Sequence, residues 1–407
     1  MRVIIQKFGG TSVARSEDRQ LVVGRVLGAM EKGLSPVVVV SAMGRAGDPY
    51  ATDTLISLAR SIHPDTAPRE IDLLASCGEI ISAVVMVNTL KSAGIDAMVL
   101  SGGQAGIITD TRFTEARIVR VDPDHLTRHV GEGKLVVVAG FQGVTDAGDI
   151  TTLGRGGSDT TAAALGVALR AEVVEIYTDV DGIKTADPSI VPEARTMESM
   201  TYEEICQLAN EGARVVHPRA VEIAMRGNIP IRIADYRGEG GGTIITHGYQ
   251  VDESWPQVRD TQVIAGVTHL KDMAQLVVPE HMSIPKSASM FRSLAQEGIS
   301  VDLINASQDA HLFCVREEQA DRALEVLRAE GLTTKARRGC SKVSIVGAGM
   351  RGVPGVMATV VEALAQAEID ILQTADSHLT ISCLVNSAST DDAVRALHRA
   401  FGLGQSD

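Results

Sequence analysis

The first 245 residues alternate short apolar runs with longer stretches of helical periodicity. The apolar runs are rich in β-branched residues, and the run at residues 36–41 contains four consecutive valines. Continuous runs of this kind are typical of strands that are buried on both faces of a parallel sheet. Parallel neighbours need crossover connections, which are usually helices. The alternation therefore predicts a doubly wound, three-layer α/β/α domain.

The remaining residues repeat internally. Residues 276–278 correspond to residues 344–346, and residues 301–303 correspond to residues 369–371 at the same spacing. Each copy reads strand, helix, strand, strand, helix, which is the order of a ferredoxin-like module, although the second copy has no apolar run left for a final strand. We therefore expect a large domain, a polar linker and two ferredoxin-like modules, at residues 1–245, 246–262, 263–338 and 339–407.

The charge balance limits the classes of partner. The 407 residues include 51 acidic and 38 basic side chains, which argues against nucleic acid or an anionic membrane as the main partner. The N-terminal apolar run is too short for a signal peptide, and no apolar run approaches the ~18 residues of a membrane span. The five cysteines are scattered without a Cys-x-x-Cys pair. We interpret them as reduced thiols and expect a cytoplasmic protein.

A glycine-rich stretch at residues 151–161 lies between an apolar run and a helical run. Its three glycines allow a tight turn whose backbone N–H groups can face a ligand. Arg155 supplies a planar set of donors suited to carboxylate or phosphate, and Ser158, Asp159 and Thr160 are residue types that cap helix N-termini. The residues alone support two interpretations equally, a capped helix and an anion site.

Three further features could belong to the same kind of site. Lys7 precedes a glycine turn between a strand and a helix. This turn is either a phosphate cradle or a plain turn with a surface lysine. It is not a P-loop, because the lysine of a P-loop follows the glycines. The loop at residues 178–188 starts at the end of a strand, where open α/β sheets bind ligands.

Glu79 lies among apolar residues. If buried, its carboxylate needs a partner such as a bound amine; at an exposed helix position it needs none.

Two other patterns carry less weight. Residues 347–352 match G-x-G-x-x-G after a strand, which is the pattern of a dinucleotide-binding turn. Too little chain follows for a Rossmann half-domain, and the next two strands are joined too tightly to be parallel, so we do not expect NAD binding. His125 and His129 lie four apart on an expected helix, and we assign them to its solvated face rather than to a metal site.

Five segments together resemble the signatures of the aspartokinase family, in the family's order along the chain. The C-terminal repeat is similar to the tandem ACT domains of the same family. The resemblance therefore covers the whole chain. The five segments are residues 7–13, 39–44, 139–143, 152–161 and 178–182.

The resemblance implies an amino-acid-kinase fold for residues 1–245. It implies the reaction of L-aspartate with ATP, bound together with Mg²⁺, to give 4-phospho-L-aspartate and ADP, the first step toward lysine, diaminopimelate, threonine and methionine. It also implies an allosteric amino-acid effector bound by the ACT domains. Because ACT modules usually pair across chains, we expect a homodimer or a higher homo-oligomer.

The resemblance also assigns roles to individual residues. Lys7 would bridge the transferring phosphoryl group, and Asp159 would orient Lys7. Glu79 would take the substrate ammonium, and Arg155 would hold the substrate carboxylate. The other substrate-binding residues would be Thr52, Gly156, Gly157 and Ser158. The other nucleotide-binding residues would be Phe8, Gly9, Gly10, Ser41, Thr178, Asp179, Lys184, Asp187, Arg214 and Val215. The effector-binding residues would be Asp302, Asn305, Gly355, Val356, Gln373, Asp376 and Ser377.

The chain departs from the family pattern at several positions. Ser189 stands where the family usually has an arginine near an ATP phosphate, and residues 233–235 replace the usual Val-Arg-Ser. The first ACT copy lacks the usual proline-glycine effector turn. Residues 373–378 are similar to the Bacillus-type isozyme that meso-diaminopimelate inhibits, so we expect that effector. Two alternatives remain, namely another amino-acid kinase of this fold, acting on glutamate or acetylglutamate, and a non-catalytic amino-acid sensor.

Overall fold

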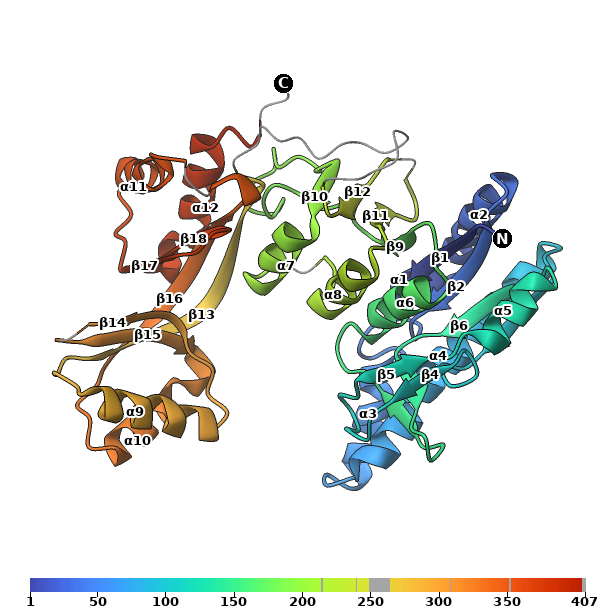
Figure 1. Ribbon diagram of the computed structural model, residues 1–407, viewed down its shortest axis with the longest axis horizontal. Helices are drawn as coiled ribbons and strands as arrows, with labels where there is room; N and C mark the ends of the chain where they lie inside the picture. The colour runs from blue at the N-terminus through green and yellow to red at the C-terminus, as the bar shows by residue number, and fades with distance from the viewer. Residues whose placement is uncertain (214, 239, 249–263, 308, 351–352, 405–407) are drawn as a thin grey trace. The chain divides into compact units, whose positions relative to one another are not determined.

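The computed structural model describes all residues except 214, 239, 249–263, 308, 351–352 and 405–407, and Figure 1 shows it as a ribbon. Most of the predicted linker therefore lies outside the described residues. The chain forms two compact units, and short segments that precede residue 245 belong to the second one. The first unit comprises Met1–Ile183, Thr196–Cys206 and Arg214–Val258, and the second comprises Lys184–Arg195, Gln207–Ala213 and Arg259–Asp407.

The elements of the first unit alternate between strands and helices along most of its length. Helix α7 begins in this unit and continues into the second. The strands are β1 (Val3–Phe8), β2 (Ser35–Val40), β3 (Ala97–Leu100), β4 (Ile107–Thr109), β5 (Ile118–Val121), β6 (Leu135–Ala139), β7 (Gln142–Val144), β8 (Ile150–Thr152), β9 (Val174–Thr178), β10 (Ser199–Thr201), β11 (Ile231–Asp235) and β12 (Thr243–Thr246). The helices are α1 (Gly10–Ala14), α2 (Ser16–Glu31), α3 (Thr52–Ile62), α4 (Pro68–Ser92), α5 (Asp124–Gly131), α6 (Gly157–Ala168), α7 (Tyr202–Asn210) and α8 (Pro218–Gly227).

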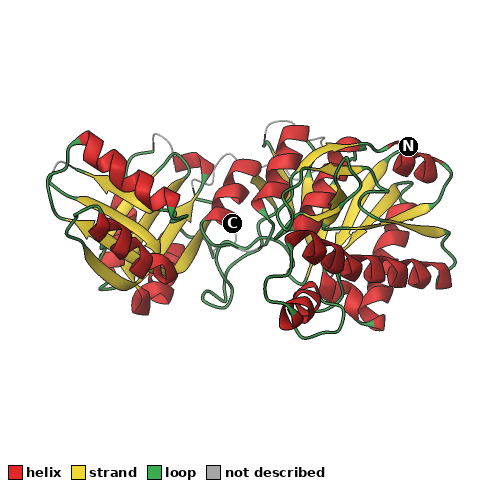
Figure 2. Cartoon of the chain, turned by 90° about the horizontal axis from the view of Figure 1, so that it is seen from below, coloured by secondary structure: helices red, strands yellow, loops and turns green. Residues whose placement is uncertain are grey.

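The first unit is built around an eight-stranded sheet in the order β10-β12-β11-β9-β1-β2-β6-β3. Its neighbouring strands run parallel, except for the antiparallel pair β11 and β12. Helices α2 and α4 pack on the face that carries Phe8 and Val38, and α6 covers the face that carries Ile5. Figure 2 shows the strands in yellow with red helices on both sides. The predicted α/β architecture is confirmed.

A smaller sheet has the order β5-β4-β7-β8, and β6 lies between β5 and β7 in the chain. Strands β7 and β8 form an antiparallel hairpin. The glycine-rich stretch begins in β8 and leads directly into α6. Strand β8 and the start of α6 therefore fix both ends of this turn.

The second unit is built around one six-stranded antiparallel sheet in the order β14-β15-β13-β16-β18-β17. Figure 1 shows α9 and α10 beside β14 and β15, and α11 and α12 beside β18. Its strands are β13 (Gly266–Val278), β14 (Asp302–Ala306), β15 (His311–Arg316), β16 (Lys335–Val346), β17 (Gln373–Asp376) and β18 (Thr380–Asn386). Its helices are α9 (Ile284–Gln296), α10 (Ala320–Ala329), α11 (Val356–Gln366) and α12 (Thr390–Ala400), with single 3₁₀ turns at Glu317–Gln319, Ala348–Met350 and Ser387–Ser389.

Strands β13 and β16 each serve both ferredoxin-like modules. The second half of β13 pairs with β15, and its first half pairs with the second half of β16, which in turn pairs with β18. Val267 of β13 accordingly belongs to the same core as Val343 and Val385. The fourth strand of the second module therefore comes from β13, which explains why the sequence after α12 needs no further strand.

The six-stranded sheet curls until its two edge strands meet. The amide of Gln373, on β17, donates to the carbonyl oxygen of Leu303, on β14, and accepts a hydrogen bond of 2.9 Å from Gln275. Leu303 has a positive φ of 47° at a register shift in β14. Side chains of Met273, Leu303 and Leu384 fill the interior of the curl.

Two segments from before residue 245 are anchored inside the second unit. In the first, the Thr185 hydroxyl lies 3.0 Å from Nε2 of His398, and Arg195 Nε donates to the Leu403 carbonyl oxygen at 3.0 Å. In the second, Glu211 Oε2 lies 2.9 Å from Nζ of the buried Lys342. These segments therefore pack with the ferredoxin-like modules.

Helix α4 is, among the described residues, the one helix long and apolar enough to span a membrane. Half of its apolar window is buried inside the protein, where Met86 and Leu90 join the core of the first unit. The buried carboxylates of Asp72 and Glu79 interrupt the apolar run. These features are those of a core helix.

Candidate active site

A cavity of about 850 Å³ opens at the carboxyl ends of β1, β2 and β6 in the first unit. This is the edge of an open α/β sheet at which ligands bind. The walls include basic, acidic and hydroxyl side chains from several elements. Ten of the predicted site residues line the cavity, namely Lys7, Gly10, Ser41, Thr52, Glu79, Arg155, Gly156, Gly157, Ser158 and Asp159.

Lys7 and Asp159 form an ion pair in the wall of this cavity. The Lys7 ammonium nitrogen lies 2.7 Å from Oδ1 of Asp159, and the two side chains are only 12% and 13% exposed. Lys7 comes from β1, and Asp159 lies in the first turn of α6. The carboxylate therefore fixes the position of a lysine at the end of a central strand, with a short, partly buried contact.

Glu79 is a buried carboxylate with an unpaired oxygen. Its Oε1 accepts hydrogen bonds from the backbone N–H of Ala42 at 3.2 Å and from the Thr52 hydroxyl at 3.4 Å. Its Oε2 accepts none from any residue that the structure describes. Burial raises the pKa of Glu79 to about 8, and the two hydrogen bonds oppose that rise. A cationic ligand at Oε2 would supply the missing partner.

The glycine-rich turn presents Arg155 and the start of α6 to the same cavity. Gly156 has a positive φ of 66° and is the N-cap of α6. A Cβ atom at Gly156 would lie 2.2 Å from the His217 side chain, so both conformation and space require glycine here. The prediction that the helix is capped by one of residues 158–160 is wrong, because the N-cap, Gly156, lies two residues before Ser158. Arg155 is exposed, so its guanidinium is available to a ligand.

Asp72 is a site-forming residue that the sequence reasoning missed. Its fully buried carboxylate accepts hydrogen bonds from the backbone N–H groups of Thr114 and Thr152, each at 2.9 Å, and from the Thr152 hydroxyl at 2.6 Å. It thereby holds β8 immediately before the glycine-rich turn. The sequence contains a signal for this burial, because Asp72 precedes Glu79 by two helical turns and therefore lies on the same face of the helix.

Some predicted nucleotide residues do not line the cavity. Phe8 is fully buried and stacks on Tyr177 at a centroid distance of 4.9 Å, so a ligand could reach only its backbone. Asp179 Oδ2 lies 3.3 Å from Nη2 of Arg45, a cavity residue that the sequence reasoning did not single out. Arg214 lies outside the described residues. The roles of Gly9, Thr178, Lys184, Asp187 and Val215 stay predictions, and Lys184 and Asp187 belong to the second unit.

Comparisons with known proteins agree with this arrangement. A model of the amino acid kinase family matches residues 2–235, and a model of an ACT domain matches residues 335–399. Aspartokinase 1 of Bacillus subtilis (strain 168) is 45% identical over 408 residues, which cover all of both chains. The chain belongs to the aspartokinase family. It is a kinase with the amino acid kinase fold.

Solved aspartokinases share the fold over almost the whole chain. The crystal structure of E. coli aspartokinase III in complex with aspartate and ADP (R-state) matches with a TM-score of 0.77 at 25% identity, over 98% of this chain and 99% of that one. The same enzyme in complex with lysine and aspartate (T-state) matches with a TM-score of 0.76 at 25% identity, over the same shares.

The predicted effector residues of this aspartokinase lie in two settings. Asp302 pairs with the ammonium group of Lys342, and Gln373 has both ends of its amide engaged by Leu303 and Gln275. The curl of the sheet brings these two predicted residues close together. The others lie at exposed strand positions (Asn305 and Asp376), just after β17 (Ser377), or at the start of α11 (Gly355 and Val356). Their roles stay predictions.

Proposed function

We propose that this aspartokinase transfers the γ-phosphoryl group of ATP to the side-chain carboxylate of L-aspartate, giving 4-phospho-L-aspartate and ADP. The observation that carries the proposal is the cavity itself. It places the buried, half-paired carboxylate of Glu79 in one space with the Lys7–Asp159 ion pair and the exposed Arg155.

The charges of the cavity complement those of aspartate. The substrate carries one ammonium and two carboxylates, and the cavity offers the half-paired carboxylate of Glu79 together with the cationic side chains of Arg155 and Lys7. Arg155 can bind the α-carboxylate with two parallel hydrogen bonds. Glu79 favours a free ammonium group over an acylated one, because an N-acetyl substrate would leave the buried carboxylate unpaired.

Phosphoryl transfer needs positioning and charge stabilisation and no covalent nucleophile. Lys7 supplies a fixed positive charge where charge develops on the transferring group, and Asp159 holds it there. The N-terminus of α6 adds backbone N–H donors on the same side of the cavity.

The donor set fits ATP bound with Mg²⁺. Mg²⁺ usually keeps several waters and is held through phosphates with one or two carboxylates, and not by a protein cage. Within the described ranges, no group of three or more metal-ligating side chains would form such a cage. Asp159, which lines the cavity, and Asp179, which pairs with the cavity residue Arg45, would supply such carboxylates. Mg²⁺ would neutralise phosphate charge there, while Lys7 and the glycine N–H groups of residues 9 and 10 orient the phosphates.

A coupled ADP-release assay with aspartate, glutamate and N-acetylglutamate tests the reaction. Turnover is expected with aspartate and at most weak with the other two. A preference for glutamate or acetylglutamate would identify another amino-acid kinase, and the absence of turnover with all three would identify a sensor.

The geometry makes a separate prediction for Arg155. Arg155→Ala should raise the KM for aspartate about tenfold or more, because it removes a charge-assisted bidentate contact, and should change the KM for ATP much less. Steady-state kinetics with each substrate varied in turn measures both constants. Arg112→Ala, which alters an exposed arginine paired with Asp110, is the matched control. An equal effect on both constants would contradict the assignment.

We further propose feedback inhibition through the ACT modules, by meso-diaminopimelate. The support is the similarity of residues 373–378 to the isozyme that this compound inhibits. Lysine is the competing candidate, because a solved relative is complexed with it. Inhibition by lysine with diaminopimelate inert in the same assay would overturn this proposal. A homodimer or higher homo-oligomer in the cytoplasm is part of the same proposal, and light scattering on the purified chain tests the oligomer.

A further inference from the structure

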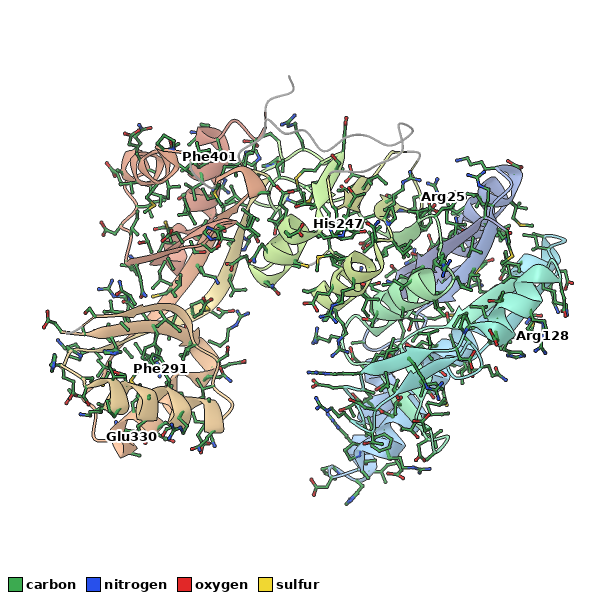
Figure 3. The ribbon with its side chains drawn as sticks, viewed as in Figure 1. Arg25, Arg128, His247, Phe291, Glu330 and Phe401 are labelled. Carbon is green, nitrogen blue, oxygen red and sulfur yellow. The ribbon has the colours of Figure 1, made fainter. Side chains whose placement is uncertain are left out.

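Helix α5, in the first unit and away from the cavity residues, carries two histidines that face each other. Arg128, which lies between them in sequence, marks this helix in Figure 3. The Nε2 atoms of His125 and His129 are 3.2 Å apart, and their ring centroids are 4.8 Å apart. The proposed kinase reaction makes no use of this pair.

The partners of the other ring nitrogens define the tautomers. Nδ1 of His125 lies 3.0 Å from the carbonyl oxygen of Gln104, and Nδ1 of His129 lies 3.3 Å from Oε2 of Glu132. Both partners can only accept, so each Nδ1 carries a hydrogen. Each neutral imidazole then has its lone pair on Nε2, and the two nitrogens that carry these lone pairs are only 3.2 Å apart. This arrangement is repulsive unless a cation lies between them.

The spacing of the two Nε2 atoms suits a metal ion. Zinc binds imidazole nitrogen at about 2.0–2.1 Å in tetrahedral sites, which places two nitrogen ligands about 3.3 Å apart. We propose, in place of the solvated helix face that the sequence favoured, that His125 and His129 together bind a divalent transition-metal cation, with Zn²⁺ as the reference ion, through their two Nε2 atoms. Across the described residues no third His, Cys, Asp or Glu completes a cluster. Water or a small ligand would fill the remaining positions.

The surroundings support the pair in the way that a metal site requires. Metal-bound histidines usually donate their second N–H to a carbonyl or a carboxylate, and these rings do both. The Gln104 carbonyl is held by a turn, in which Gln104 N–H donates to the Ser101 hydroxyl and Ser101 N–H donates to the Gln104 side chain. Oε2 of Glu132, behind His129, also accepts a hydrogen bond of 3.3 Å from Nζ of Lys134.

The test is a Zn²⁺ titration of the full-length chain without nucleotide, in competition with a chromophoric zinc chelator. Wild type is compared with His125→Ala, His129→Ala and the control His63→Ala, which removes an exposed histidine from the end of α3. All four chains keep Cys77, so zinc held by that exposed thiol is common to them. ADP release with saturating substrates should be equal in all four, which establishes that they are folded.

Wild type and His63→Ala are expected to bind one zinc ion that the other two variants bind at least about tenfold more weakly. Glu132→Gln should weaken the same site by about tenfold, because it removes the carboxylate behind His129. As an independent readout, the electron paramagnetic resonance spectrum of bound Cu²⁺ should show two nitrogen ligands in wild type and one in either histidine variant. Equal zinc binding by all four chains would overturn the proposal and leave a shared proton as the cation between the rings.

Discussion

At the scale of single residues, we expect Glu79 to couple binding of the proposed substrate to the release of a proton. Burial raises its pKa to about 8, so the carboxyl group is mostly neutral near pH 7 when no ligand is bound. An ammonium ion at Oε2 would favour the charged form and lower this pKa. Binding of aspartate is therefore expected to release a proton. Without aspartate, the raised pKa stabilises the folded chain only while the Glu79 carboxyl group is neutral, so this stability is lost as the pH rises from about 4.5, the ordinary pKa of a glutamate, to about 8.

The KM for aspartate should accordingly fall as the pH rises from about 6.5 to about 8.5, by up to about tenfold per pH unit below the pKa. Glu79→Gln should raise this KM and remove its pH dependence. Without aspartate, the melting temperature of wild type relative to Glu79→Gln should decline as the pH rises from about 5 to about 8 and stay level above that. Parallel pH profiles for the two chains would contradict the coupling.

Lys7 is expected to act on turnover more than on binding. Lys7→Ala should lower kcat by at least about 100-fold, because it removes a fixed charge from the transition state. The control is Lys32→Ala, which changes an exposed lysine at the end of α2. The ADP-release assay measures kcat, and circular dichroism compares the folds. Near-normal turnover by a folded Lys7→Ala chain would overturn the assignment.

At the scale of elements, helix α4 illustrates what the sequence could and could not predict. Its helical periodicity is evident from the sequence, but the stretch Cys77-Gly78-Glu79 favours an interruption, whereas the helix is continuous. Gly78 sits inside it because a Cβ atom there would lie 2.9 Å from both Ala42 and the Tyr50 carbonyl oxygen. That approach involves residues distant in sequence, so local pattern could not reveal it. The burial of Glu79 follows from the same packing.

The contribution of α4 to the site can be measured at Asp72. Asp72→Ala should destabilise the protein by about 3 kcal/mol, because it leaves buried backbone N–H groups of Thr114 and Thr152 without their acceptor. It should also raise the KM for aspartate, since β8 sets the position of the glycine-rich turn. Urea unfolding measures the first effect and kinetics the second. Asp146→Ala, which breaks an exposed ion pair with Arg120, should change neither.

At the scale of the whole molecule, the internal repeat predicted two ferredoxin-like modules but not the strands that they share. Each strand's alternation of apolar and polar residues predicts which face is buried, but not which strand lies alongside it. The long pairing of β13 with β16 therefore became visible only in the structure. Lys7, Gly10 and Ser41 came together because they lie at or just after strands whose carboxyl ends share one edge of the sheet, a relation that topology does determine. Glu79, by contrast, reaches the cavity from within α4.

The shared strands make a truncation prediction. A chain that ends at residue 338 loses residues 342–346, which pair with the first half of β13. Ile264 and Val267, now buried, would be exposed together with an unpaired strand edge, so the shortened chain should aggregate. The soluble fraction after expression measures this. A chain that ends at residue 404 is the control, and it should remain soluble. A soluble, monodisperse 1–338 chain would show that the first module folds without its neighbour.

The anchored segments determine how regulation could be exchanged between relatives by protein engineering. A chimaera joined after residue 245 would combine one parent's Lys184–Arg195 and Gln207–Ala213 with another parent's ACT modules. The contacts of Thr185 with His398 and of Glu211 with Lys342 would then join residues from two different parents. An exchange of effector specificity must therefore include all three segments of the second unit. The two shorter ones, Lys184–Arg195 and Gln207–Ala213, lie within the kinase sequence.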